Sequence, residues 1–303
     1  MAPYEELIRQ LRALGTELVN PRTVDLDRLS PLEIVRKIND EDATVAEVVR
    51  KALPEIAQAA EWCADTLRGG GRVFYIGAGT SGRLGVLDAA ECPPTFGTQP
   101  EQIIGLIAGG YDSLMLSKEG AEDKREDAVR ALKEHDLTKS DLVIGIAASR
   151  RTPYTIAGLE YGQSVGARAV FIICNAGDSL ETHPDLLIAL PVGPEAITGS
   201  TRMKSGTAQK MTLNLISTTA MVLLGKTYGN LMVDLLARSE KLAARSRKIL
   251  MDLYNLSAGD ADQLLRNADG SVKTAIVMHM KSCTKDEALR RLSLADGFIA
   301  RIA

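Results

Sequence analysis

The chain has 303 residues, of which 45% are hydrophobic and 25% charged, proportions typical of a globular protein that buries its core without disulfides. Its formal net charge is −3, and it has no basic run of the kind that marks nucleic-acid-binding proteins. It contains no run of about 18 apolar residues, and its N-terminus lacks the apolar stretch of a signal peptide. We therefore expect a cytoplasmic protein that binds a small molecule, with no nucleic-acid or membrane partner.

The cysteines give no sign of a structural bridge or a metal site. Cys63, Cys92, Cys174 and Cys283 are far apart and include no CxxC pair. This spacing predicts neither a disulfide framework nor a zinc site. We expect four reduced thiols.

Residues 1–68 are predicted to form a helical segment that packs on the core. Residues 1–30 look largely irregular, and a helical pattern begins at Pro31. Thr44-Val45-Ala46-Glu47 has the residues of a capping box, which predicts a helix from there to about Leu67. Gly69-Gly70-Gly71 then ends this helix.

Residues 69–255 are predicted to form an α/β domain. Short runs rich in Val, Ile and Leu, without a polar face, indicate strands buried on both sides. Helical patterns between them, such as Lys124–Glu134 and Pro153–Val165, give the alternation of a doubly wound, mostly parallel sheet. The predicted strands are Val73–Ile76, Ile103–Ile107, Leu142–Ala147, Ala169–Cys174 and Leu186–Leu190.

Two long helices, Thr201–Leu224 and Leu231–Leu253, are predicted to close this domain. The pattern changes after Ser257, and residues 256–303 are predicted to form a small helical appendage. Its three short helices are Asp260–Leu265, Val272–Met280 and Lys285–Ala295, the last opened by a capping box at Thr284–Glu287.

A glycine-rich turn, Gly77-Ala78-Gly79-Thr80-Ser81-Gly82-Arg83, directly follows the first predicted strand. Its glycines permit positive φ and close backbone approach, and the next helix start offers N–H groups to an anion. The spacing also satisfies the GxGxxG pattern of dinucleotide-binding folds. Two features favour a phosphate ester: Pro93-Pro94 is expected to break the next helix early, and Thr80 and Ser81 add side-chain donors. A plain strand-to-helix turn is the remaining interpretation.

A second hydroxyl-rich turn, Ala148–Pro153, follows the third predicted strand. Pro153 suits the first position of a helix, with Thr152 as its N-cap. Ser149 and Thr152 are both placed to reach a phosphate, although capping alone also explains them.

A third segment, Thr198–Thr207, opens a predicted helix with five hydroxyls and two cations in ten residues. The dipole at a helix N-terminus disfavours cations. Arg202 and Lys204 therefore indicate either a nearby anionic ligand or two solvated side chains.

Two glutamates are candidate acid–base groups. Glu91 has small or apolar neighbours, which predicts partial desolvation and a raised pKa. Glu122 stands at the start of a helical stretch. Each is also compatible with an ordinary solvated surface carboxylate.

Together these segments resemble the N-acetylmuramic acid 6-phosphate etherases. The resemblance covers nearly the whole chain and is carried above all by GAGTSGRLG, LDAAECPPTFG and TGSTRMKSGTAQK, which begin at residues 77, 87 and 198. The family has a sugar-isomerase (SIS) domain and a small ubiquitin-associated-like helical tail, in agreement with the layout above. The resemblance also implies a homodimer that needs no metal.

By this resemblance Glu91 corresponds to the proton donor, and Glu122 to the second catalytic glutamate, taken as the base. The positions of the sugar-phosphate-binding loops correspond to Thr80, Ser81, Ser149 and Thr152. The family substrate, N-acetylmuramic acid 6-phosphate, gives N-acetylglucosamine 6-phosphate and D-lactate in cell-wall sugar recycling. Elimination followed by water addition needs two carboxyl groups in opposite protonation states and no redox step, so no nicotinamide cofactor is expected.

The second turn departs from the family pattern Ala-Ser-Gly-Arg-Thr-Pro, because Arg150 stands at the glycine position. If that position needs positive φ, Arg150 strains the turn by about 1–3 kcal/mol. If the turn keeps an ordinary conformation, the guanidinium can instead contact the phosphate. We expect strain.

Three other functions are compatible with parts of the sequence. Glucokinase regulatory proteins share these loops without catalysis, but they carry two SIS domains and are about twice as long. An aldose–ketose phosphate isomerase on the same fold also uses a carboxylate base. A dinucleotide-binding oxidoreductase is the most distant alternative.

Overall fold

The computed structural model describes residues 14–302 except 177–179, 181 and 236–239, together with residues 5, 8 and 12. The chain forms two compact units, one of residues 1–89 and 103–216, the other of residues 90–102 and 217–303. The division passes through two long helices, α5 (Gly79–Phe96) and α8 (Lys204–Leu223). The boundaries of the three parts predicted above stay a prediction.

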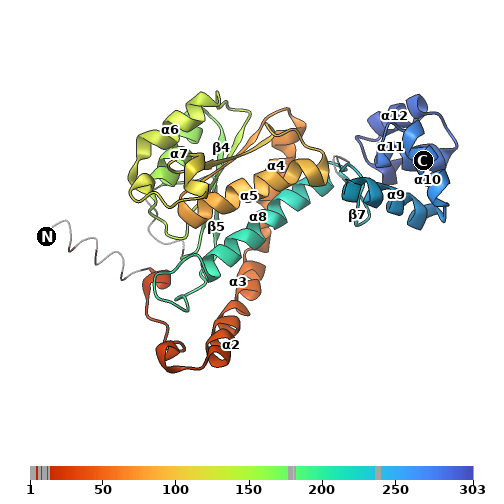
Figure 1. Cartoon of the computed structure of the whole chain (residues 1–303). Helices are drawn as coiled ribbons and strands as arrows, with labels where there is room; N and C mark the ends of the chain where they lie inside the picture. The colour runs from red at the N-terminus through yellow and green to blue at the C-terminus, as the bar shows by residue number, and fades with distance from the viewer. Residues whose placement is uncertain are drawn as a thin grey trace. The chain divides into compact units, whose positions relative to one another are not determined.

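The first unit, shown in Figure 1, is built on a parallel sheet. The strand order is β2-β1-β3-β4-β5, which confirms the predicted fold class. Every pairing within it is parallel, and Val73 pairs with Ile103 on one side and Leu142 on the other. The strands lie where the apolar runs predicted them: β1 Val73–Gly77, β2 Ile103–Ile107, β3 Leu142–Ile146, β4 Arg168–Ile173 and β5 Leu186–Ala189.

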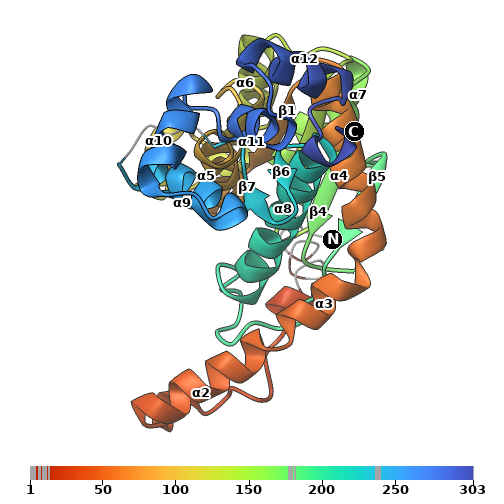
Figure 2. The same cartoon turned by 90° about the vertical axis from the view of Figure 1, so that its right-hand side faces the viewer.

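Helices cover both faces of the sheet, and the apolar strands β1 and β3 are therefore buried throughout. On one face Gly85 of α5 packs so closely on Tyr75 that an added Cβ would lie 2.9 Å from the Tyr75 Cβ. On the other, Gly158 of α7 (Pro153–Ser164) packs on Ile76, and α6 (Arg125–Glu134) lies against α7. Figure 2 shows α4 (Leu53–Arg68) beside β5.

Residues 14–30 are attached by hydrogen bonds to loops at the carboxyl ends of β4 and β5. Asn175 Nδ2 donates to Thr16 Oγ1, 3.2 Å away, and Thr23 Oγ1 donates to the Ala196 carbonyl at 2.9 Å. The chain then forms α2 (Pro31–Asp42) and α3 (Val45–Lys51) before α4. This region therefore packs on the sheet domain through specific polar contacts.

The capping box predicted at Thr44 is wrong. Thr44 has helical dihedrals and its hydroxyl donates to the Glu41 carbonyl at 2.7 Å, so it continues the turn after α2. The predicted single helix is also interrupted at Ala52, between α3 and α4. Pro54 accounts for this break, because its ring has no N–H and crowds the carbonyl four residues earlier.

The expectation that Pro93-Pro94 breaks the next helix early is also wrong, since α5 continues to Phe96. Each proline removes only the hydrogen bond of its own missing N–H, and both stand in the last turn. Gly97 N still donates to the Pro93 carbonyl at 3.0 Å. A helix therefore tolerates prolines that come just before its end.

The second unit contains the helical appendage, drawn in blue in Figure 1. Its helices are α9 Glu240–Tyr254, α10 Ala258–Asn267, α11 Val272–Lys281 and α12 Lys285–Leu294. The three predicted tail helices are confirmed, and Thr284 Oγ1 accepts from Glu287 N at the start of α12. The helix predicted over Leu231–Leu253 is wrong in its first part: Thr227–Tyr228 (β6) and Leu231–Met232 (β7) form an antiparallel hairpin.

Candidate functional site

The strand order places a topological switch point at the carboxyl ends of β1 and β3, where a ligand crevice is expected. From β1 the chain passes through α5 to β2 on one side, then returns through α6 to β3 on the other side of β1. The connections after β1 and β3 therefore leave the sheet in opposite directions, and such a switch point is where doubly wound sheets bind ligands. The first two hydroxyl-rich turns follow these two strands.

In the first turn α5 begins at Gly79, so Thr80 and Ser81 lie in the first turn of the helix. Gly79 has φ +54°. A Cβ on Gly77 would lie 2.8 Å from the Ile146 carbonyl oxygen and 2.9 Å from Gly82 N, so larger residues do not fit there. The glycines thus bring a helix N-terminus directly over the end of the sheet, the arrangement that binds anions.

Helix α8 supports this turn from behind. Ser81 Oγ donates to Oε1 of Gln209 at 3.0 Å, and both side chains are buried. Gly206 packs beside Thr80, where an added Cβ would lie 3.4 Å from Thr80 Cγ2. Sequence reasoning missed Gln209, which lies within TGSTRMKSGTAQK but 128 positions from its partner.

The second turn brings Ser149 and Thr152 together. Their hydroxyl oxygens are 3.5 Å apart, and Arg151 N donates to Ser149 Oγ at 3.3 Å. Pro153 is the first residue of α7, as predicted, and Thr152 occupies the extended N-cap position. Its side chain makes no capping hydrogen bond. The Thr152 hydroxyl therefore faces Ser149 rather than the first turn of its own helix.

Strain at Arg150 is not found. The non-glycine residues with positive φ in the described chain are Asp136, Asn255, Asp269, Ser282 and Asp296. Arg150 thus has an ordinary backbone conformation, and the expectation of strain is wrong. The chain enters α7 through the extended backbone of Thr152, a conformation that Pro153 favours and that needs no left-handed residue.

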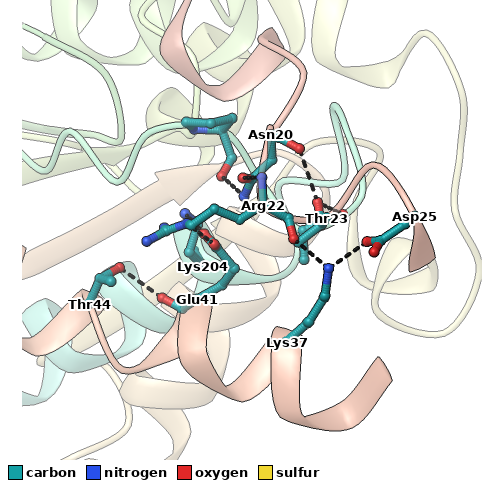
Figure 3. A network of polar contacts seen from close by, with 10 residues as sticks. Asn20, Arg22, Thr23, Asp25, Lys37, Glu41, Thr44 and Lys204 are labelled. Atoms are coloured by element: carbon teal, nitrogen blue, oxygen red, sulfur yellow. Dashed lines mark hydrogen bonds and ion pairs between the residues drawn. The ribbon is translucent and has the colours of Figure 1, made fainter. Parts of the chain in front are cut away.

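The third segment has a different role from the one its cations suggested. Lys204, the first residue of α8, is 2% exposed, and its Nζ lies 2.7 Å from Oε2 of Glu41. Glu41 also pairs with Arg22 Nε at 2.6 Å, as Figure 3 shows. Burial raises the pKa of Glu41, but hydrogen bonds from Lys204 and Arg22 outweigh it, so the pKa lies below its ordinary value. The charge of Lys204 is therefore neutralised by Glu41 inside the protein, and its position indicates neither a solvated side chain nor an external anionic ligand.

Glu195 closes the N-terminus of α8 from within the protein. Its buried carboxylate accepts from Lys204 N at 2.8 Å, Ser205 N at 2.9 Å and Ser205 Oγ at 2.7 Å. A carboxylate at this position satisfies N–H groups that the helix cannot pair itself. No sequence pattern indicated this cap, because Glu195 lies in a loop without regular structure.

The two candidate catalytic glutamates lie in different units. Glu122 is exposed in a single 3-10 turn, Ala121–Asp123, which follows Gly120 at φ +71°. Glu91 lies in α5, within the second unit, and is also exposed. The expected desolvation of Glu91 is wrong for the single chain, because the helix turns Cys92 inward and Glu91 outward.

A cavity of about 580 Å³ lies beside the segment that carries Glu122. It is lined by β2, by α6 and by the chain between them, including Ala121 and Lys124. None of the four hydroxyl residues of the first two turns lines it. Tyr154 of α7 forms part of its wall, where burial raises the pKa of the phenol.

Neither a membrane span nor a metal cluster is found among the described residues. No helix in the described part of the chain is long and apolar enough to cross a membrane. Over the same residues, no group of three or more His, Cys, Asp or Glu side chains is arranged to hold a metal ion.

Known families and relatives agree with this architecture. Residues 127–219 match the SIS domain, and residues 55–163 match the glucokinase regulatory protein N-terminal SIS domain. The parallel sheet and these matches define a SIS-domain protein.

Curated relatives narrow the assignment. The chain is 49% identical over 296 residues to N-acetylmuramic acid 6-phosphate etherase of Rhodopirellula baltica, covering 98% of each chain. The etherase of Clostridium beijerinckii is 49% identical over 96% of each chain. That of Escherichia coli O127:H6 is 49% identical over 97% of this chain and 98% of its own. This chain belongs to the N-acetylmuramic acid 6-phosphate etherase family.

Proposed function

We propose that this chain cleaves the D-lactyl ether of N-acetylmuramic acid 6-phosphate as a carbon–oxygen lyase, giving N-acetylglucosamine 6-phosphate and D-lactate. The observation that carries the proposal is 49% identity to a named etherase over 98% of both chains. We further propose a cytoplasmic homodimer that acts in cell-wall sugar recycling without a metal or organic cofactor.

The 6-phosphate is assigned to the crevice between β1 and β3. Thr80 and Ser81 stand in the first turn of α5, where helix N–H groups and the dipole favour an anion. Ser149 and Thr152 stand on the opposite side, with their hydroxyls 3.5 Å apart. Glu195 already caps the N-terminus of α8, so we assign the phosphate to the turns that follow β1 and β3.

Glu122 is assigned as the base. In the open-chain sugar, C2 lies between the aldehyde carbon and the carbon that carries the lactyl ether. The carbonyl makes the C2 proton acidic, and the Glu122 carboxylate takes that proton. A positioned base of this kind typically contributes about 10²–10⁴-fold to the rate.

Glu91 is assigned as the acid. The C3–O bond breaks as the electrons from C2 form the alkene, and Glu91 protonates the departing oxygen because an alkoxide is a poor leaving group. Lactate leaves with the ether oxygen. Water then adds at C3 and a proton returns to C2, which completes N-acetylglucosamine 6-phosphate.

Isotope labelling of the reaction tests this function. We expect purified protein to release D-lactate from N-acetylmuramic acid 6-phosphate in ¹⁸O-labelled water, with the label at C3 of the sugar and none in lactate. The same reaction in heavy water should place deuterium at C2. Label in the lactate would show cleavage on the other side of the ether oxygen and refute the mechanism.

The rival functions give different outcomes in this experiment. An aldose–ketose isomerase would release no lactate from this substrate. A regulatory protein would bind the sugar phosphate and change neither part of it. N-Acetylmuramic acid without phosphate serves as the matched control, and its turnover at an equal rate would remove the phosphate assignment.

A further inference from the structure

The contact between Ser81 and Gln209 has a direction that conflicts with phosphate binding. Ser81 Oγ donates to Gln209 Oε1, and the two side chains are 7% and 1% exposed. Nε2 of the same amide is buried and has no hydrogen-bond partner among the described residues. The amide therefore uses its acceptor on Ser81 and leaves its donor unsatisfied, which is costly inside a protein.

A serine hydroxyl has a single proton, whereas phosphate oxygens are acceptors. While its proton points at Gln209, Ser81 cannot donate to a phosphate. If the proton turned away and the amide stayed still, Gln209 Oε1 would lose its partner as well. Donation from Ser81 to Gln209 and donation from Ser81 to a phosphate therefore exclude each other.

A half-turn of the amide removes the conflict. Nε2 then donates to Ser81 Oγ, and the Ser81 proton is released toward the ligand. Oε1 then takes the side of the amide that faces the Cys174 thiol. Burial raises the pKa of Cys174 to about 12, so its sulfur keeps its proton. Cys174 Sγ donates this proton to the Ser205 carbonyl, 3.6 Å away, and the S–H turns to Oε1 when the amide turns over.

We propose that Gln209 is a positioning residue for the phosphate group, whose amide turns over on binding so that hydrogen bonds run from Gln209 through Ser81 to the ligand. This rests on the proposed function, in which Ser81 contacts the 6-phosphate. An amide suits the task because it can accept in one state and donate in the other, whereas a carboxylate only accepts.

Gln209→Glu tests this directly. The introduced carboxylate, when ionised, holds the Ser81 proton, so binding of N-acetylglucosamine 6-phosphate should weaken at least about tenfold, the effect of losing a hydrogen bond to a charged group. A protonated carboxyl can donate as the amide does, and burial raises its pKa. We therefore expect affinity to approach the wild-type value as pH falls from about 8 to about 5.5. Calorimetric titration at each pH, always compared with wild type, corrects for ionisation of the phosphate.

Gln209→Met is the matched control, because it keeps the length of the side chain and removes both polar atoms. It should weaken binding by a factor that does not change with pH. In a Ser81→Ala background it should add no further loss, because the hydrogen-bond relay is already broken. Thermal melting of each variant shows whether it is folded, and Gln209→Met carries the test if the glutamate variant is not.

Three results would overturn the inference: wild-type affinity in Gln209→Met, an equal and pH-independent loss in both variants, or full additivity with Ser81→Ala. Failure of the proposed function is distinguishable from these. If Gln209→Glu shows the pH signature but the wild-type protein releases no lactate, the reaction alone is refuted. Normal lactate release with unaltered binding in both variants refutes the role of Gln209 alone.

Discussion

Removing either member of the buried Glu41–Lys204 pair should destabilise the first unit, but by unequal amounts. At 2.7 Å, and with an effective dielectric constant of about 20, the attraction is roughly 6 kcal/mol, much of it offset by desolvation of the two charges. Glu41→Met leaves the Lys204 ammonium buried without the carboxylate, which should cost about 3–5 kcal/mol. Lys204→Met leaves Glu41 paired with the largely exposed Arg22, so it should cost less, about 1.5–3 kcal/mol.

The double variant separates electrostatics from packing. With both charges replaced by methionine, no buried ion is left unpaired, and stability should return to within about 1 kcal/mol of wild type or exceed it. Fluorescence of Trp62 follows the transition, because this single tryptophan lies in α4 of the first unit. In a domain of about 150–250 residues, the loss in Glu41→Met corresponds to roughly 6–20 °C in melting temperature. Equal costs for the two single variants, or additive costs in the double, would refute the reasoning.

The pair also makes stability depend on pH in a fixed direction. The pKa of Glu41 is lowered in the folded protein, so its contribution is present above the ordinary carboxyl value of 4.5. The contribution is lost as pH falls through the folded pKa. Urea titrations between about pH 7 and pH 3 should therefore show a steeper loss of stability in wild type than in Glu41→Met. Parallel curves would contradict this assignment.

Four further variants test the site. Glu122→Gln should lower both lactate release and C2 deuterium exchange by about 10² or more, and normal exchange in the variant would remove Glu122 as the base. Glu91→Gln should stop lactate release while C2 exchange stays measurable; equal loss of both would assign Glu91 a binding or deprotonating role. Ser81→Ala should weaken binding of the phosphorylated sugar by about 1–3 kcal/mol and scarcely affect the unphosphorylated one, as calorimetry can compare. Arg150→Gly relieves no strain, because the backbone at this position is ordinary. It removes a guanidinium that can contact the phosphate, so we expect a several-fold loss of affinity that grows at low ionic strength. Tighter binding in this variant would contradict the reasoning.

The strands of this fold were predictable because each contains a run of apolar residues, and β1 and β3 are buried throughout, which leaves no polar face in their sequence. The ends of the helices were harder to predict from the sequence. The proline rule gave the wrong end for α5, because a proline breaks the interior of a helix but is tolerated in its last turn, where Pro93 stands. The predicted helix over residues 231–253 failed because the apolar residues of a short hairpin look helical in a single sequence.

Only those features of the site that a local sequence pattern indicates could be predicted. The positions of the first two turns could be predicted because each follows a strand directly. Lys204 and Glu41 are 163 positions apart, and no local pattern shows that one neutralises the other. The exposure of Glu91 depends on which side of α5 carries it, which its small neighbours do not determine.

The order of strands in the sheet also governs when this protein acquires its crevice during synthesis. β1 pairs with β3 through residues 73 and 142, so a nascent chain stopped between them has one wall of the crevice and not the other. Gln209, the support of Ser81, leaves the ribosome later still. Because parallel strands pair only across long stretches of chain, β1 emerges long before its neighbour. A sugar phosphate therefore cannot rescue a truncated product that ends before β3, since the second turn that would bind the phosphate has not yet been made.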